Sequence, residues 1–100
     1  MSDNIEGEAC WTFLTNHAHV LLCLAKCSSM RMKDIAIEVG ITERAVQRII
    51  ADLISCGCIF RKKDGRCNIY KICMERHLNH PIESHRQITD LVGLIVDKNI

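Results

Sequence analysis

The sequence predicts a mainly α-helical protein with one small β-hairpin. Apolar residues recur at helical spacing in several parts of the chain, which indicates helices with a buried face. Between two short stretches rich in Ile, Phe and Tyr lies Asp64-Gly65, a pair that is typical of a hairpin turn. Only four of the 100 residues are aromatic, so the core is expected to be aliphatic.

The most informative stretch is residues 33–58, KDIAIEVGITERAVQRIIADLISCGC, which predicts two helices joined by a tight turn at 33–56. Ile35, Ala36 and Val39 share one face of the first helix, and Gly40 can adopt the positive φ that ends it. Thr42 is a good N-cap for the second helix. An apolar stripe follows on that helix, made of Ala45, Val46, Ile49, Ile50, Leu53 and Ile54. This is a helix-turn-helix pattern.

The polar residues of the second helix are the first candidates for function. Arg44, Gln47 and Arg48 lie off the apolar stripe, near the N-terminal half of the helix. In a helix-turn-helix, that half of the second helix reaches base edges in the major groove of DNA. The alternative is an ordinary helical hairpin whose outer face is polar because it is solvated.

Residues 58–72, CIFRKKDGRCNIYKI, predict two short strands with a basic tip, which we call the wing. Alone, a charge run at a turn is usually just solvated. Directly after a helix-turn-helix, however, a basic hairpin can follow phosphates or enter the minor groove. The wing cations are Arg61, Lys62, Lys63 and Arg66.

Charge is unevenly distributed along the chain, although its formal net charge is only +1. Residues 28–72 hold nine Lys/Arg and five Asp/Glu, whereas both flanking segments are net negative. This concentration is expected when one face of a protein meets phosphates.

Helices are also predicted on both sides of this basic centre, at about 11–26 and 82–97. Of the remaining segments, 1–10 is expected to be loose, 30–32 extended and 73–81 irregular. The first helix is apolar on two faces, and the last is too apolar for an exposed helix. A chain of 100 residues can hardly bury both, so we expect self-association. The candidate dimer-interface residues are Phe13, Val20, Leu24, Ile88, Leu91, Val92 and Ile95.

Seven cysteines and five histidines raise the questions of disulfides and metals. The odd cysteine count and the absence of a signal peptide or an apolar run of membrane-spanning length predict reduced thiols in the cytoplasm. Neither Cys56-Gly-Cys58 with Cys67 and Cys73, nor the histidines at 17, 19, 77, 80 and 85, show structural zinc spacing, so no metal or other cofactor is predicted. A redox-sensing thiol at Cys27, Cys67 or Cys73 stays open. No catalytic motif is present, so the protein is not expected to be an enzyme.

Taken together, TFLTNHAHVLLCLA (12–25), DIAIEVGITERAVQRIIADL (34–53) and RKKDGRCNIY (61–70) resemble winged helix-turn-helix transcription regulators, most closely short members of the MarR-like group. The resemblance implies a homodimer with the first and last helices at its interface. It also implies that Thr42, Arg44, Gln47 and Arg48 face the major groove, with Arg61, Lys63 and Arg66 on the wing.

Residues 11–100 are therefore expected to form a single winged-helix domain that binds double-stranded DNA sequence-specifically as a dimer. Two alternatives remain: a winged-helix protein-interaction module without DNA binding, and a thiol- or metal-responsive form of the regulator. The sequence identifies no operator, effector ligand or sign of regulation.

Overall fold

The computed structural model describes residues 11–96, which form helices and one two-stranded antiparallel sheet. Residues 1–10, predicted to be loose, and residues 97–100 lie outside this part. No helix within it has both the length and the apolar character needed to cross a membrane. The elements are α1 (Asn16–Lys26), α2 (Met32–Val39), α3 (Glu43–Ser55), β1 (Ile59–Asp64), β2 (Cys67–Ile72) and α4 (Ile88–Ile95).

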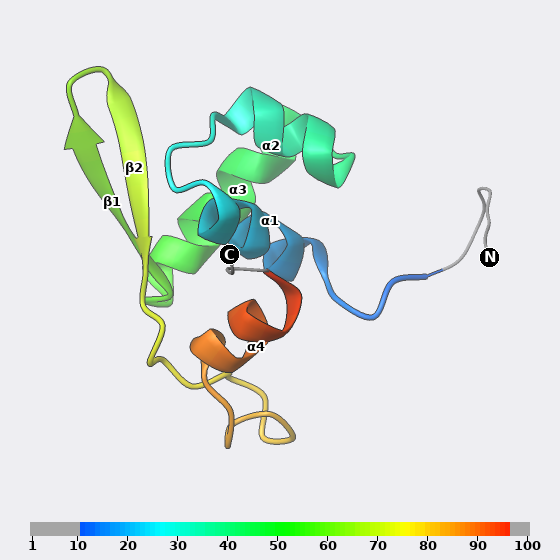
Figure 1. The fold of residues 1–100 in the computed structure, drawn as a ribbon. Helices are drawn as coiled ribbons and strands as arrows, with labels where there is room; N and C mark the ends of the chain where they lie inside the picture. The colour runs from blue at the N-terminus through cyan, green and yellow to red at the C-terminus, as the bar shows by residue number, and fades with distance from the viewer. Residues whose placement is uncertain (1–10, 97–100) are drawn as a thin grey trace.

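These elements form a winged helix, as the sequence predicts. Helix α1 lies at the centre and contacts α2, α3, β2 and α4. The hairpin stands beside the helices, and α4 lies at the far end from α2 (Figure 1). The mainly helical fold class with one small hairpin is thereby confirmed.

The core is aliphatic and is built around α1. Val20 and Leu24 are fully buried there, together with Ile35 from α2, Ile50 from α3 and Ile59 from β1. Helix α1 is apolar on two faces because neighbours from its own chain surround it. A partner is therefore not needed to bury it, contrary to the expectation from the sequence.

The turn between α2 and α3 has the predicted construction. Gly40 has a φ of 85°, and its N–H donates to the Ala36 carbonyl at 2.8 Å. The Thr42 hydroxyl accepts from the Ala45 N–H at 3.0 Å and so caps α3. This geometry fixes where the second helix starts and which face it exposes.

Gly40→Ala is expected to destabilise the protein by about 1–2 kcal/mol, because only the left-handed backbone penalises the new methyl group. A Cβ at this position would meet no heavy atom within 4 Å. Gly93→Ala is the matched control, since Gly93 lies inside α4 without a positive φ and its Cβ position is equally open. That change should stabilise the protein by about 0.5–1 kcal/mol. Urea unfolding of both variants measures the two shifts, and equal signs would contradict this account.

The hairpin has the predicted turn, with Gly65 at a φ of 65° and Asp64 paired with Cys67. Its base is tied to the loop after α1, because the Tyr70 N–H donates to the Ser28 carbonyl at 3.0 Å. The extended segment expected at 30–32 is not a strand, since Met32 already begins α2.

Both terminal helices are shorter than predicted. Helix α1 begins at Asn16 rather than near Trp11, because the Thr15 hydroxyl caps it by accepting from the Ala18 N–H at 3.3 Å. The last helix begins at Ile88 rather than Ile82, since successive turns occupy 81–85. The Asp90 carboxylate accepts from the Gln87 N–H at 2.9 Å and stabilises this later start.

Candidate nucleic-acid interface

Helix α3 presents the predicted polar face. Arg44, Gln47 and Arg48 are all exposed, while Val46 and Ile50 on the opposite side are buried. Thr42 is also exposed at the start of the helix, where its hydroxyl is engaged as the cap. The arrangement leaves two guanidinium groups and one amide available to hydrogen-bond acceptors outside the protein.

The arginines of this face are not neutralised within residues 11–96. The ion pairs there join His17 to Asp52 at 2.8 Å, Lys26 to Glu38 at 3.4 Å and Arg31 to Asp34 at 3.8 Å. None of these involves the predicted DNA-contacting cations of α3 or of the wing.

The His17–Asp52 pair connects the start of α1 to the later part of α3. Both side chains are about half exposed, at 49% and 54%, so solvent screens the interaction. Its structural effect is to direct the Asp52 carboxylate toward α1. That carboxylate is therefore occupied by a partner on the neighbouring helix.

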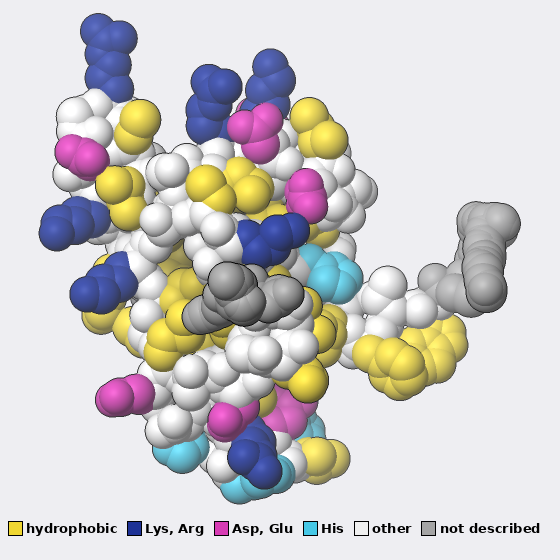
Figure 2. Space-filling view, viewed as in Figure 1, with side chains coloured by type: hydrophobic (Ala, Val, Ile, Leu, Met, Phe, Trp, Pro, Cys, Tyr) yellow, Lys and Arg dark blue, Asp and Glu magenta, His cyan; other side chains and the backbone are white. Residues whose placement is uncertain are grey.

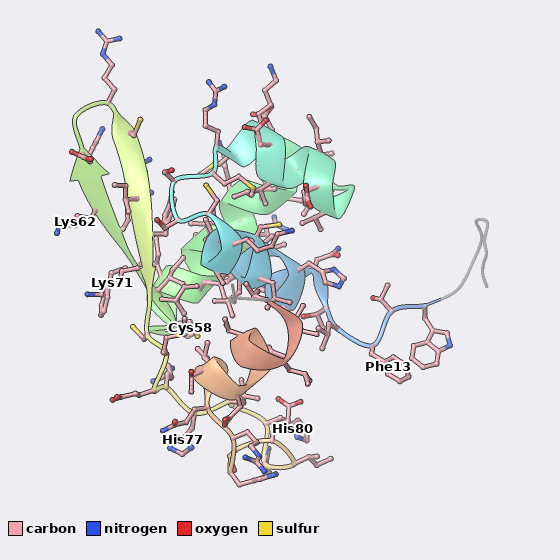
Figure 3. All side chains as sticks on the ribbon, viewed as in Figure 1. Phe13, Cys58, Lys62, Lys71, His77 and His80 are labelled. Atoms are coloured by element: carbon pink, nitrogen blue, oxygen red, sulfur yellow. The ribbon has the colours of Figure 1, made fainter. Side chains whose placement is uncertain are left out.

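The wing distributes its cations over both faces of the hairpin. Arg61 pairs with Tyr70 and Lys63 with Asn68, so these two cations share the face of buried Tyr70. Lys62 lies on the other face, as does Lys71, and both project outward from the hairpin (Figure 3). All the predicted wing cations are exposed.

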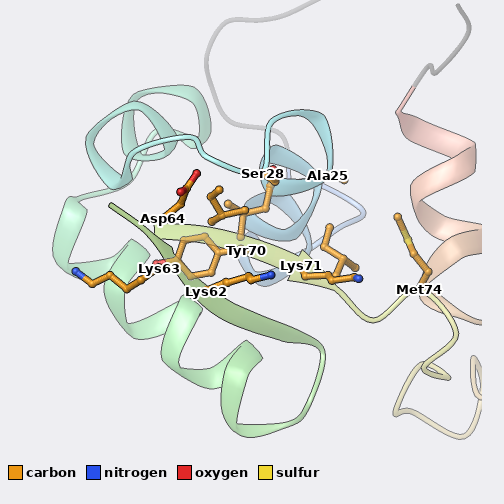
Figure 4. A pocket seen from close by; sticks show the side chains of 11 residues that line it. Ala25, Ser28, Lys62, Lys63, Asp64, Tyr70, Lys71 and Met74 are labelled. Carbon is orange, nitrogen blue, oxygen red and sulfur yellow. The ribbon is translucent and has the colours of Figure 1, made fainter. Parts of the chain in front are cut away.

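An open cavity of about 680 Å³ lies between the end of α1 and the hairpin (Figure 4). Leu24, Ala25 and Ser28 line one side, while the strands contribute Lys62, Lys63 and Lys71. The sequence counted Lys71 in the basic segment but did not assign it to the site. Lys71 lies two residues after Ile69, the cross-strand partner of Lys62, so Lys71 and Lys62 share one face of the hairpin. This strand alternation was the signal available in the sequence.

A smaller cavity of about 230 Å³ lies between the start of α2 and β2, and its lining brings Arg31 and Arg66 together. Arg31 is exposed at the N-cap of α2. Sequence reasoning did not single out Arg31, which precedes the helix-turn-helix pattern and pairs with Asp34. The fold is what places it beside the wing.

Figure 2 shows the resulting distribution of charge on one face of the molecule. Lys and Arg side chains gather over the hairpin and along the edge above α2. Most of the visible histidines lie at the opposite end, over the segment that leads to α4, where a Lys or Arg side chain is also visible. The basic centre of the sequence is therefore also a basic end of the fold.

Four predicted dimer-interface residues are corrected by their burial. Val20, Leu24, Ile88 and Val92 are core residues of the chain itself. They cannot form a surface for a second copy because neighbouring elements of the same chain cover them.

The remaining candidates for a dimer interface are still accessible. Phe13 is 90% exposed and projects away from the helices (Figure 3). Ile95 is half exposed, and Leu91 lines a cavity of about 450 Å³ together with Phe13. Leu94, which the sequence did not assign to the interface, is 79% exposed.

The six described cysteines are all free thiols, and Cys10 lies outside the described residues. Cys27 and Cys67 are exposed, whereas Cys73 is half-buried. Burial raises the pKa of the Cys23 thiol inside the core, which makes it a poor nucleophile. No three His, Cys, Asp or Glu side chains within residues 11–96 are grouped to hold a metal ion.

The fold resembles that of solved structures of other proteins. The chain is similar to AdcR, a zinc-dependent MarR family transcriptional regulator solved in its Zn(II)-bound state, at 24% identity and a TM-score of 0.47. The match covers 69% of this chain and 51% of that one, so the chain spans about half the length of that protein. No family model matches the sequence, and neither does any curated protein.

Proposed function

We propose that this protein is a DNA-binding transcription regulator that acts as a homodimer in the cytoplasm. The observation that carries the proposal is the exposed face of α3, where Gln47 is exposed and Arg44 and Arg48 have no ion-pair partner within residues 11–96. Bidentate arginine contacts to guanine and amide contacts to adenine are common means of reading bases. The basic wing beside α3 supplies contacts to phosphates.

The homodimer is supported by apolar surface that the chain leaves uncovered. Phe13, Leu94 and Ile95 are exposed, and Leu91 is only half-buried. Two copies joined through this surface would present two α3 helices. On a pseudo-palindromic operator, these would enter major grooves about 34 Å apart.

Selection from a random-sequence DNA library tests the proposal directly. A specific dimer should enrich two inverted half-sites separated by about one helical turn. Enrichment of one isolated half-site would argue against the dimer. If no sequence is enriched, retention on heparin is measured at several salt concentrations. Retention that does not depend on salt would favour a protein-interaction module, because a winged-helix fold does not by itself imply DNA binding.

Lys63→Ala should weaken binding to every DNA sequence about equally, because a wing cation meets phosphates rather than bases. The slope of log K against log salt should fall by about 0.9 for one lost phosphate contact. Fluorescence anisotropy over a salt series measures both quantities. Lys26→Ala is the matched control, because Lys26 is paired with Glu38 at 3.4 Å. An equal loss in both variants would show that only overall charge matters.

A further inference from the structure

Two cysteines flank the glycine at which α3 ends and the wing begins. Cys56 is the C-cap of α3, and Cys58 immediately precedes β1. Gly57 between them has a φ of 78°, which turns the chain sharply. The Cys56 thiol and the Arg76 side chain both lie close enough to the Cys58 thiol to influence its pKa.

The backbone around this pair is fixed from both sides. The Cys56 N–H donates to the Asp52 carbonyl at 3.0 Å, and the Cys58 N–H donates to the Leu53 carbonyl at 2.9 Å. The Cys58 carbonyl accepts from the Cys73 N–H at 2.9 Å. Cα atoms two residues apart span at most about 7 Å, and the sharp turn at Gly57 shortens that span toward the roughly 4.4–6.8 Å found in disulfides.

We propose that Cys56 and Cys58 form a redox-active dithiol, which a small disulfide such as glutathione disulfide oxidises to an intramolecular Cys56–Cys58 disulfide. Among the single thiols, the sequence left a redox-sensing role open for Cys27, Cys67 and Cys73. The fold instead points to this pair, because the turn at Gly57 and the backbone hydrogen bonds to α3 hold the two cysteines next to each other.

The reaction proceeds by two thiol–disulfide exchanges. The Cys56 thiolate attacks one sulfur of glutathione disulfide, the S–S bond breaks, and one glutathione thiolate leaves. The Cys58 thiolate then attacks the Cys56 sulfur of the mixed disulfide and releases the second glutathione thiolate. The two protein thiols lose two electrons and two protons, and one glutathione disulfide becomes two thiols.

The surroundings of Cys58 favour this order. Burial, followed by the charge of Cys56, raises the pKa of the Cys58 thiol, so Cys58 is the poorer first nucleophile. Once Cys56 is in a mixed disulfide its charge is gone, while the nearby Arg76 still lowers the pKa of Cys58. Both cysteines are only partly buried, so the pair is open to an oxidant from solvent.

The new bond would join the end of α3 to the start of the wing. The Cys56 thiol would then leave the Asp52 carbonyl, to which it donates at 3.1 Å in the reduced protein. The wing would take a different position relative to α3. This consequence, unlike the disulfide itself, rests on the proposed DNA-binding function.

The chemistry is tested on the full chain equilibrated with glutathione and glutathione disulfide, alkylated, digested and analysed by mass spectrometry. The peptide that contains both cysteines should lose two hydrogens without gaining glutathione. Cys58→Ser should instead retain glutathione on Cys56, while Cys73→Ser should form the disulfide as the unchanged protein does. A Cys58–Cys73 bond, or a Cys56 that accepts glutathione but never releases it in the unchanged protein, would overturn the assignment.

The consequence for DNA is measured separately, by anisotropy on the selected operator in a C27S/C67S background that removes the exposed thiols. Oxidation should weaken binding about ten-fold, as expected if the displaced wing loses one or two phosphate contacts. Unchanged affinity of the oxidised protein would refute the coupling. If the reduced protein binds no DNA, the proposed function and the coupling fail, while the mass spectrum still decides the disulfide.

Discussion

Replacing Ile50 with alanine should lower the free energy of unfolding by about 2–5 kcal/mol, the largest effect expected of any single substitution discussed. Ile50 lies on α3 and is only 1% exposed. Its removal leaves a cavity at the centre of the helical core. The chain is small and such domains are stable by only about 5–15 kcal/mol, so a substantial part of the stability would be lost.

Ile37→Ala is the matched control for this substitution. It removes the same atoms from α2, but Ile37 is 73% exposed, so the change should stay within about 0.5 kcal/mol. Thermal and urea unfolding of the two variants give the comparison. Similar losses would mean that α3 is not packed through the face described above.

Arg48→Ala should cost about 1–3 kcal/mol of binding to the selected operator. The reason is the loss of a bidentate base contact from an exposed residue of α3. Binding to unrelated DNA should change much less, because a base contact contributes chiefly on the correct sequence. The variant should therefore lose discrimination rather than general affinity.

Competition anisotropy with specific and unrelated duplexes measures this discrimination. Arg86→Ala is the control, because it removes the same charge from an exposed residue of the segment before α4. If Arg48→Ala weakens binding to all duplexes alike, Arg48 contacts phosphates and the reading face must lie elsewhere.

Short-range signals in the sequence predicted the central elements well. Gly40, Thr42 and Asp64-Gly65 specify local backbone geometry, so the turn, the cap of α3 and the hairpin could be placed without knowing the fold. The terminal helices were less accurate. Their starts depend on which of several polar residues caps the helix. Thr15 caps α1, and the Gln87–Asp90 pair caps α4.

The dimer surface could not be predicted in detail because periodicity does not identify the neighbour that buries an apolar face. The two apolar faces of α1 led to the prediction that Val20 and Leu24 lie at a dimer interface, but other elements of the same chain cover both residues. The proximity of Arg31 to Arg66 likewise depends on how the wing folds back toward α2. Neither fact is encoded in a local pattern.

The hydrogen bond from the Tyr70 N–H to the Ser28 carbonyl attaches one part of the wing to the loop after α1 and leaves the other part exposed. At its base, Ile59 and Tyr70 are buried and β2 is held to the loop after α1, whereas residues 61–67 are exposed. The hairpin is therefore held against the helices at its base and exposed at its tip. In the proposed complex with DNA, this exposed tip would be able to bend and follow grooves of different width.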